Sequence, residues 1–324
     1  MLSVDRIRQE LGNVLDQTDC SAGKRVVGKV RDSYLLSGGR RLLVTTDRVS
    51  AFDCVLGTIP FKGQVLNQLA AFWFERTAGI APNHVIGVPD PNLMLVAECE
   101  QLPLEFIVRG YITGVTKTSA WVNYDAGMRT ICGNKLPDGL RKDQRLAHPI
   151  LTPTTKHELH DRNISRDEAI TEGLISADLF DEAARLCLRL YQEGVAQAAA
   201  RGLILVDTKY ELGLLDGRLV VSDEIHTPDS SRYWFADSYE SCFREGREQR
   251  KLDKEYVREW LAARGFRGDG PPPVLTDEVR IEAARRYLQA YELITGLPFA
   301  PVEGPIGERV RRAIETAAAC AQAN

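Results

Sequence analysis

Most of the side chains that could do chemistry lie in one segment of the sequence, residues 207–234 (DTKYELGLLDGRLVVSDEIHTPDSSRYW). The segment follows the apolar run LILV, which predicts a buried strand, and Asp207, Lys209 and Glu211 alternate so that they share one face of it. It ends in a polar turn, TPDSSR at 227–232, whose hydroxyls, amides and guanidinium group suit a phosphate. Together the two parts indicate a site for a divalent metal ion and phosphate groups.

The metal site depends on the hairpin that joins the two parts. A strict two-residue Asp-Gly turn would put Asp223 on the opposite face from Glu211. We therefore predict a three-residue loop at 215–217 with its glycine in the left-handed conformation, which places Lys209 opposite Asp223 and Glu211 diagonally from it. In that register the two carboxylates can share one divalent ion. The alternative is a solvated hairpin with ordinary surface ion pairs, which the flanking apolar run and polar turn disfavour.

The same residues carry a resemblance to a known family. DTKYELG and SDEIHTPDSSRYW closely resemble the signature region of the SAICAR synthetases, the phosphoribosylaminoimidazole-succinocarboxamide synthases of purine biosynthesis. Five further segments resemble that family in its order: VVGKVRDSY at 26–34, TTDRVSAFD at 45–53, IPFKGQVLNQLAAFWF at 59–74, LEFIVRGYITG at 104–114 and KLDKEYVREWL at 251–261. The match covers nearly the whole chain, so it is far more specific than one short motif.

The resemblance implies a ligase that uses ATP and Mg²⁺. It would join L-aspartate to the carboxylate of carboxyaminoimidazole ribonucleotide and release SAICAR, ADP and phosphate. Because a carboxylate is a poor electrophile, we expect ATP to convert it first to a carboxyl phosphate, which an amine attacks readily. Glu211 and Asp223 are expected to hold Mg²⁺, while Lys29 and Lys209 assist phosphoryl transfer. Asp207 is expected to orient Lys209 or a metal-bound water.

The resemblance also implies an ATP site. Five residues are expected to bind ATP: Gly28, Lys29, Arg31, Lys62 and Glu98. The glycine lets the backbone approach the phosphates, the lysine beside it supplies charge, and Lys62 opens a helix whose first amides can face an anion. In this family the segment from Glu98 to Leu104 connects two lobes and contacts adenine through its backbone. Without the resemblance, a lone Gly-Lys pair is weak evidence for phosphate binding, and the alternative is a surface lysine on an edge strand.

A second set of residues is expected to bind the other substrates. The set consists of Arg109, Asp161, Ser230, Ser231, Arg232 and Lys254. Its last arginine suits the phosphate of the ribonucleotide, because guanidinium groups bind phosphates bidentately, and its aspartate and lysine are expected on the side of L-aspartate. A further hydroxyl contact can come from Thr116, Thr118 or Ser119, since this segment is longer than in some members of the family.

The composition narrows the function classes. The 324 residues carry a net charge of -4 with an isoelectric point near 5.9, which argues against a general nucleic-acid binder. Seven scattered cysteines without a C-x-x-C pair predict reduced thiols in a cytoplasmic protein. The first residues alternate charged and apolar types, so we expect neither a signal peptide nor a membrane span. The expected partners are small-molecule substrates, with no nucleic acid and no membrane, and a homo-oligomer is left open.

The expected fold is α+β, with two lobes and ATP in the cleft between them. Residues 1–103 would form a strand-rich ATP-binding lobe, and residues 104–324 a mixed α/β lobe with the metal and substrate sites and the C-terminal helices. The sequence predicts a helix from Thr276 to Thr295, closed by Gly296. Two other functions stay open: a small-molecule kinase of a related fold, which would make ADP without requiring aspartate, and a non-catalytic nucleotide-binding module.

Overall fold

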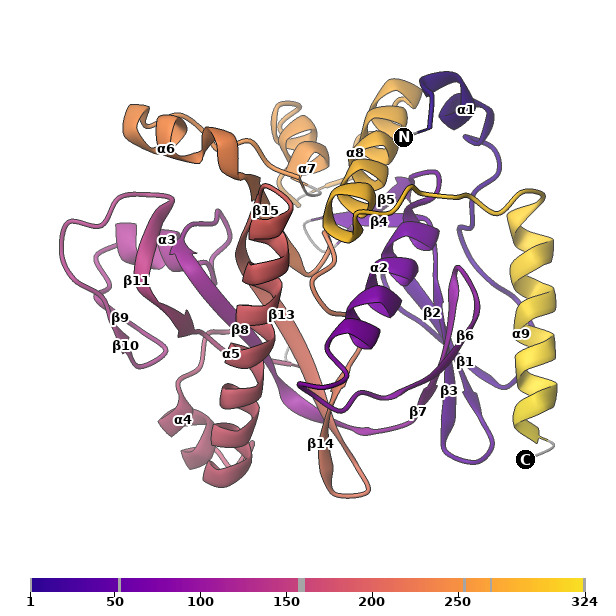
Figure 1. Ribbon diagram of the computed structural model, residues 1–324, viewed down its shortest axis with the longest axis horizontal. Coiled ribbons are helices and arrows are strands. Elements are labelled where there is room, and N and C mark those ends of the chain that lie inside the picture. Colours follow the sequence, from indigo (N-terminus) through magenta and orange to yellow (C-terminus); the bar gives the residue numbers. More distant parts are fainter. Residues whose placement is uncertain (1, 52–53, 157–160, 253–254, 269, 323–324) are drawn as a thin grey trace. The chain divides into compact units, whose positions relative to one another are not determined.

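The computed structural model describes residues 2–51, 54–156, 161–252, 255–268 and 270–322 (Figure 1). The chain divides into two compact units. Unit 1 consists of residues 1–74, 84–98 and 252–324, and unit 2 of residues 75–83 and 99–251. Both units combine strands with helices, which confirms the predicted α+β class.

Unit 1 is built on a five-stranded antiparallel sheet with the order β1-β2-β3-β7-β6. Its strands are β1 (Lys24–Val27), β2 (Arg31–Leu36), β3 (Arg40–Thr45), β6 (Val85–Asp90) and β7 (Leu93–Ala97). A separate hairpin pairs β4 (Arg48–Ala51) with β5 (Cys54–Thr58). The helices are α1 (Val4–Gln9), α2 (Lys62–Arg76), whose last two residues belong to unit 2, α7 (Glu255–Ala262), α8 (Asp277–Thr295) and α9 (Ile306–Gln322).

The sheet of unit 1 is covered by the last helix of the chain, α9, which contacts β2, β6 and β7 (Figure 1). Val310, Ile314 and Ala317 recur at helical spacing and form one apolar face of α9. That face packs against buried residues of the sheet, among them Tyr34 and Leu42. The sequence placed the C-terminal helices with the second lobe, but residues 252–324 cluster with unit 1, because an apolar helix face needs an apolar sheet to cover it.

Unit 2 is built around two long antiparallel strands, β8 (Glu100–Ile112) and β13 (Leu203–Leu215). They form the middle of a sheet with the order β11-β8-β13-β14, in which β12 also pairs with β8 and β15 with β13. The shorter strands are β9 (Thr130–Ile131), β10 (Asn134–Lys135), β11 (Gln144–Leu151), β12 (Thr154–Thr155), β14 (Arg218–Ser222) and β15 (Ser231–Phe235). Helix α5 (Ala177–Ala200) packs on β8 and β13, and the other helices are α3 (Ala120–Asp125), α4 (Arg166–Thr171) and α6 (Ala236–Glu245).

Local sequence signals account for the ends of several helices. Helix α8 has Thr276 as its N-cap residue, and Gly296 closes it in the left-handed conformation with φ 79°, which confirms the predicted helix. Ser165 begins α4 with a capping box, in which its hydroxyl accepts from the Glu168 backbone and the Glu168 side chain accepts from the Ser165 backbone. Short-range patterns therefore determine where these helices begin and end.

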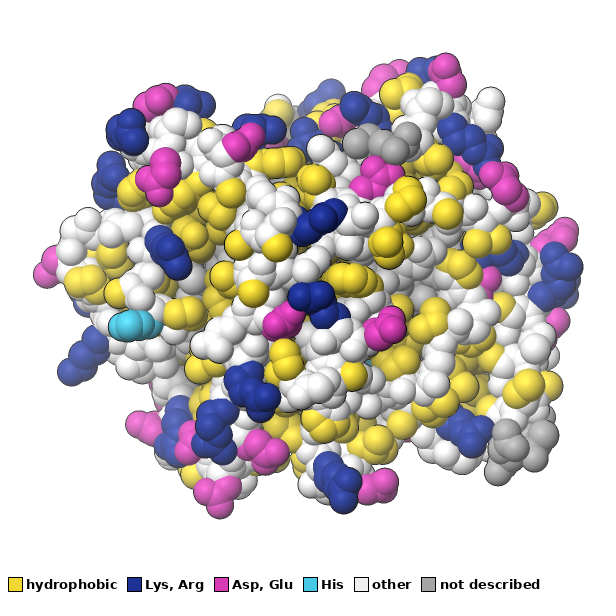
Figure 2. Space-filling model, in the orientation of Figure 1, with side chains coloured by type: hydrophobic (Ala, Val, Ile, Leu, Met, Phe, Trp, Pro, Cys, Tyr) yellow, Lys and Arg dark blue, Asp and Glu magenta, His cyan; other side chains and the backbone are white. Residues whose placement is uncertain are grey.

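The surface, the cysteines and the helices add three observations. On the face drawn in Figure 2, acidic and basic side chains are interspersed, and they do not gather into a field of one sign. All seven cysteines are free thiols. None of the helices within the described ranges is both long enough and apolar enough to cross a membrane.

Candidate active site

The chemistry of unit 2 is concentrated on one face of its two central strands. In the register of β8 and β13, Asp207 lies opposite Arg109, and Glu211 lies opposite Glu105. Lys209 stands between the two acids of β13, so the alternation predicted from the sequence brings all of these side chains to one face. Directly opposed residues have their Cβ atoms only about 5 Å apart, so their charges interact strongly.

The ammonium group of Lys209 is held between two carboxylates. Its Nζ donates to Glu105 Oε1 at 2.8 Å and to Glu211 Oε1 at 2.7 Å. Lys156, which follows β12, donates to the other oxygen of Glu211. The four side chains therefore form a compact network of alternating charge.

Burial and charge compete in setting the pKa values in this network. Burial lowers the pKa of Lys209, but Glu211, Glu105 and Asp223 outweigh burial and raise it above its usual value. For Glu211, burial raises the pKa, and the two neighbouring ammonium groups more than reverse that effect. Burial is also the main cause that raises the pKa of Glu105. Lys209 therefore stays cationic and Glu211 stays anionic at neutral pH.

The alternation of charges is the signal that could have identified Glu105 from the sequence. Glu105 lies on the same face of β8 as Arg109, which follows it by four residues. Asp207 and Glu211 share a face of β13 with the same spacing. Lys156 gave no comparable signal, because it meets Glu211 across 55 positions of sequence. Its place in the network depends on how β12 pairs with β8.

The predicted three-residue loop between β13 and β14 is wrong. Leu215 pairs with Arg218, so the loop consists only of Asp216 and Gly217. Both residues have positive φ angles, 51° and 74°, as a type I′ turn requires. This turn matches the twist of the flanking strands, and an Asp-Gly pair adopts it readily, so the tighter loop forms.

The position of Asp223 follows from that turn. Glu211 pairs with Ser222, which is the last residue of β14, and Asp223 does not lie opposite Lys209 as predicted. Asp223 leaves the strand with a φ of 62°, and this left-handed conformation ends the alternation of faces. Its carboxylate nevertheless raises the pKa of Lys209, so its charge acts on the same ammonium group.

The carboxylates of this network match the oxygen ligands that Mg²⁺ prefers. Within the part of the chain that the structure describes, no three His, Cys, Asp or Glu side chains converge on a point where they could hold a metal ion. Both oxygens of Glu211 accept hydrogen bonds from ammonium groups. The donor set is chemically suited to Mg²⁺, and assigning the ion to Glu211 and Asp223 stays a prediction.

A second network joins two arginines through Asp207. Arg109 Nη1 lies 3.1 Å from Asp207 Oδ2, and Arg232 Nη1 donates to the same oxygen at 2.5 Å. Arg109 is buried and also donates to Thr152 Oγ1 at 2.7 Å and to the carbonyl of Thr118. Asp207 was expected to orient Lys209 or a metal-bound water, and that role stays a prediction; in the structure its carboxylate binds two guanidinium groups.

The turn after β14 brings the two predicted serines to different places. Ser231 is buried, and its hydroxyl donates to Thr208 Oγ1 at 2.8 Å, so it ties β15 to β13. Ser230 is half-buried, and its Oγ accepts from the backbone of Thr227 at 3.2 Å. The Ser230 carbonyl accepts from the Lys209 backbone at 2.9 Å, which fixes the turn beside the charged network.

The structure distinguishes among the three candidates for a further hydroxyl contact. Ser119 lies against Gly114, where an added Cβ would come within 2.4 Å of the Ser119 Cβ and within 3.4 Å of Arg232 Nη2. Thr116 is exposed and Thr118 half-buried. Ser119 is therefore the candidate that shares a neighbourhood with Arg232.

Of the two residues expected to bind L-aspartate, Asp161 lies within the described part of the chain. Asp161 is exposed, and its charge helps to raise the pKa of Glu105, so it acts on the Lys209 network. Lys254 lies outside the described residues.

The residues expected to bind ATP lie in unit 1. Gly28 and Lys29 lie at the tip of the β1–β2 hairpin, and Arg31 begins β2. Glu98 forms a bidentate ion pair with Arg41, at 2.5 and 2.7 Å. Lys62 is fully buried, and its ammonium lies 5.4 Å from the centroid of the Tyr287 ring. The hairpin tip is thus an exposed candidate for phosphate binding, and the Lys62 ammonium is packed within the protein.

Comparisons with known proteins identify the same family as the sequence motifs. The sequence model of the family described as SAICAR synthetase matches residues 24–271. The chain belongs to the SAICAR synthetase family. It is similar to the phosphoribosylaminoimidazole-succinocarboxamide synthase of Legionella pneumophila (strain Lens), with 47% identity over 305 residues, 93% of this chain and 97% of that relative.

Solved structures of SAICAR synthetases have the same fold. The SAICAR synthase of Saccharomyces cerevisiae, complexed with SAICAR, has a TM-score of 0.77 and 33% identity, and the match covers 89% of this chain and all of that one. A SAICAR synthetase in complex with ADP has a TM-score of 0.65 and 25% identity, covering 86% of this chain and all of the other. The chain is an ATP-dependent ligase of purine biosynthesis that condenses carboxyaminoimidazole ribonucleotide with L-aspartate. The family predicted from the sequence is confirmed, and the kinase and the binding module are not favoured.

Proposed function

We propose that the charged face of β8 and β13 carries out the ligation through a carboxyl phosphate. The observation that supports this best is the ammonium of Lys209, held between Glu105 and Glu211 on the same face as the pair Arg109 and Asp207. A fixed cation of this kind stabilises negative charge that develops on phosphate oxygens in the transition state. The neighbouring guanidinium groups suit the phosphate of a nucleotide substrate.

The reaction then has two balanced steps. In the first, the substrate carboxylate attacks the γ-phosphorus of ATP, and the bond to ADP breaks. In the second, the amine of L-aspartate attacks the acyl carbon, phosphate leaves with its electron pair, and the proton lost by the amine ends on the released phosphate. The first step makes the carboxyl carbon electrophilic, so the amide bond forms without a strong base.

Lys209 assists the first step by neutralising the transferred phosphoryl group, with Lys29 acting on the ATP phosphates. Glu211 and Asp223 would hold Mg²⁺, an ion that neutralises charge on the ATP phosphates when it is bound. Glu105 keeps Lys209 in position through the 2.8 Å contact. In this assignment Lys209 acts on the phosphates, and the carboxylates of Glu211 and Asp223 act on the metal ion.

The arginine pair serves the ribonucleotide. Arg109 and Arg232 share one oxygen of Asp207, which holds the two guanidinium groups together against their mutual repulsion. Each guanidinium has five donors, so both retain N–H groups for a phosphate. Ser119 and Ser230 supply hydroxyl groups to the same substrate. The free cysteines and the metabolic role support a cytoplasmic location.

One assay tests the proposal: ADP release in the presence of carboxyaminoimidazole ribonucleotide, with and without L-aspartate. We expect SAICAR and ADP to form in equal amounts, and turnover to require aspartate. Full-rate ADP release without aspartate would indicate a kinase. No turnover under either condition would indicate a binding module.

A further inference from the structure

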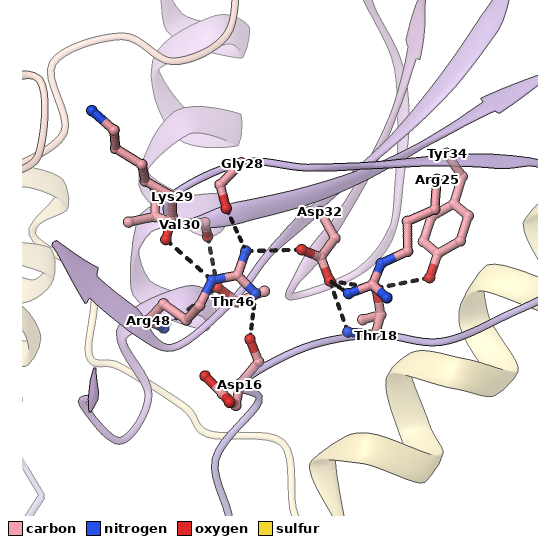
Figure 3. Close-up of polar contacts among 10 residues, drawn as sticks. All are labelled: Asp16, Thr18, Arg25, Gly28, Lys29, Val30, Asp32, Tyr34, Thr46 and Arg48. Atoms are coloured by element: carbon pink, nitrogen blue, oxygen red, sulfur yellow. Dashed lines mark hydrogen bonds and ion pairs between the residues drawn. The ribbon is translucent and has the colours of Figure 1, made fainter. Parts of the chain in front are cut away.

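A buried arginine, Arg48, lies directly behind the hairpin tip that carries Gly28 and Lys29 (Figure 3). It begins β4, and its guanidinium donates to the Gly28 carbonyl at 2.9 Å and to the Lys29 carbonyl at 3.1 Å. It also donates to the carbonyl of Asp16. One side chain thus joins the hairpin tip to two other segments of unit 1.

The next carbonyl of the tip is held as well. Val30 accepts from the backbone N–H of Thr46 at 3.0 Å and from the Thr46 hydroxyl at 2.7 Å. Three consecutive carbonyls, from Gly28 to Val30, are therefore all bound by Arg48 or Thr46. This is unusual for the tip of a hairpin, where carbonyls commonly face solvent.

The bound carbonyls determine the direction of the amides. No cis peptide bond occurs in the described chain, and in a trans peptide the C=O and the following N–H point in opposite directions. The N–H groups of Lys29 and Val30 are therefore directed away from the Arg48 guanidinium, and the N–H group of Arg31 is directed away from Thr46. Figure 3 shows the Lys29 side chain directed away from the Arg48 guanidinium while its carbonyl faces that group.

The guanidinium itself is fixed by a buried carboxylate. Asp32 is fully buried, and its Oδ1 accepts from Arg48 Nη2 at 2.8 Å. Its Oδ2 accepts from the backbone and hydroxyl of Thr18, at 2.7 and 2.8 Å, and from Arg25 at 3.0 Å. A carboxylate with so many donors holds the arginine in one orientation.

We propose that Arg48 is a positioning residue for ATP: by binding the carbonyls of Gly28 and Lys29, it keeps the amides and the Lys29 side chain of the tip oriented toward the ATP phosphates. The inference rests on the proposed assignment of this tip to ATP. Arg48 binds the tip through its carbonyls, on the side opposite to the amides of Lys29 and Val30, so it acts through the loop and not on the nucleotide.

Arg48→Lys is the principal test. Lysine keeps the charge beside Asp32, but its single nitrogen has three donors and cannot reach all four acceptors in the geometry of the guanidinium fork. We expect the KM for ATP and the dissociation constant for ADP to rise by about 10- to 100-fold, because small misplacements of binding groups cost about that much. The KM values for the ribonucleotide and for aspartate should stay unchanged. The dissociation constant for ADP is measured by titration calorimetry.

Two further variants separate positioning from loss of stability. Arg309→Lys weakens a largely buried ion pair with Asp90 elsewhere in unit 1, and the side chain of Arg309 bonds Asp90 and Asn92, so ATP and ADP affinity should not change. Thr46→Val is nearly isosteric and removes the hydroxyl contact to Val30, so it should weaken ADP binding in the same direction but less. If Arg48→Lys does not fold, Thr46→Val still tests the proposal.

Lys29→Ala distinguishes a failure of this inference from a failure of the ATP assignment. If Lys29→Ala leaves the KM for ATP unchanged, the tip does not bind ATP and both statements fall. If Lys29→Ala raises that KM while folded Arg48→Lys and Thr46→Val leave it at the wild-type value, only the role of Arg48 is overturned. An equal effect of Arg48→Lys on all three substrates would likewise overturn it.

Discussion

Arg109 and Asp207 lie directly opposite each other on β8 and β13, and their side chains meet with 3.1 Å between Nη1 and Oδ2. Asp207 is also the register partner of Arg232 on β15, whose guanidinium binds the same oxygen. The backbone pairing of three strands thus brings one carboxylate between two guanidinium groups. Because Arg109 and Asp207 are buried, neither charge has water as a substitute partner.

Asp207→Asn should therefore weaken both the fold and the binding of the ribonucleotide. Removing one partner of a buried ion pair costs about 3 to 5 kcal/mol, because the other charge stays buried and uncompensated. We expect the free energy of unfolding, measured with urea, to fall by about 3 kcal/mol. The KM for the ribonucleotide should rise more than the KM for ATP. Asp237→Asn is the matched control, because Asp237 pairs with Arg250 on the exposed surface and should change neither quantity appreciably. Equal stability of the two variants would contradict the prediction.

Glu211→Gln tests the metal and phosphate site. The amide keeps one oxygen but removes the charge that, after burial, is the largest influence on the pKa of Lys209. We expect Mg²⁺-dependent SAICAR formation to fall by roughly a hundredfold or more, with an unchanged circular dichroism spectrum. Mg²⁺ binding measured by calorimetry in the presence of an ATP analogue should weaken in parallel.

The control for this variant is Glu172→Gln, which removes a carboxylate from a surface ion pair with Arg162. It should keep wild-type activity. Wild-type activity in Glu211→Gln itself would remove Glu211 from the site.

The sequence was sufficient for what depends on local patterns. Alternation placed Asp207 and Glu211 on one face, and the Thr276 and Gly296 signals bounded α8. The sequence-based prediction was wrong at the hairpin. The register there follows from the fit of a type I′ turn to the twist of the strands, and not from the alignment of Asp223 with Lys209 that we predicted. Contacts such as that of Asp207 with Arg109, 98 residues apart, needed the pairing of distant strands, which local patterns do not contain.

Asp47 should make the protein less stable as the pH rises from about 4 to 6. Burial raises the pKa of this carboxyl from 3.8 to about 6, although the backbone N–H groups of Leu15 and Gly63 oppose the shift. Between these values the folded state holds a proton that the unfolded state has lost. The contribution is thus fully present below pH 3.8 and is lost as the pH rises through 6, a change on the order of 3 kcal/mol. Asp47→Asn does not titrate, so the difference in the free energy of unfolding between wild type and variant should shrink over this range. A difference that does not vary with pH would refute the assignment.

His226 should act in the opposite direction. Burial lowers its pKa from 6.5 to about 3, and its Nε2 lies 2.6 Å from the Tyr210 hydroxyl. Below pH 6.5 the histidine is protonated in the unfolded chain but stays neutral in the folded protein. The free energy of unfolding therefore decreases as the pH falls, by about 2 kcal/mol at pH 5. The contribution of Asp47 to stability increases as the pH falls through the same range, so the two effects partly cancel in the wild type. His226→Gln keeps a polar partner for Tyr210 but does not titrate in this range, so this variant should be less sensitive to acid than the wild type in urea unfolding at pH 7 and pH 5. If both proteins lose the same free energy between these pH values, the buried histidine does not control the acid response.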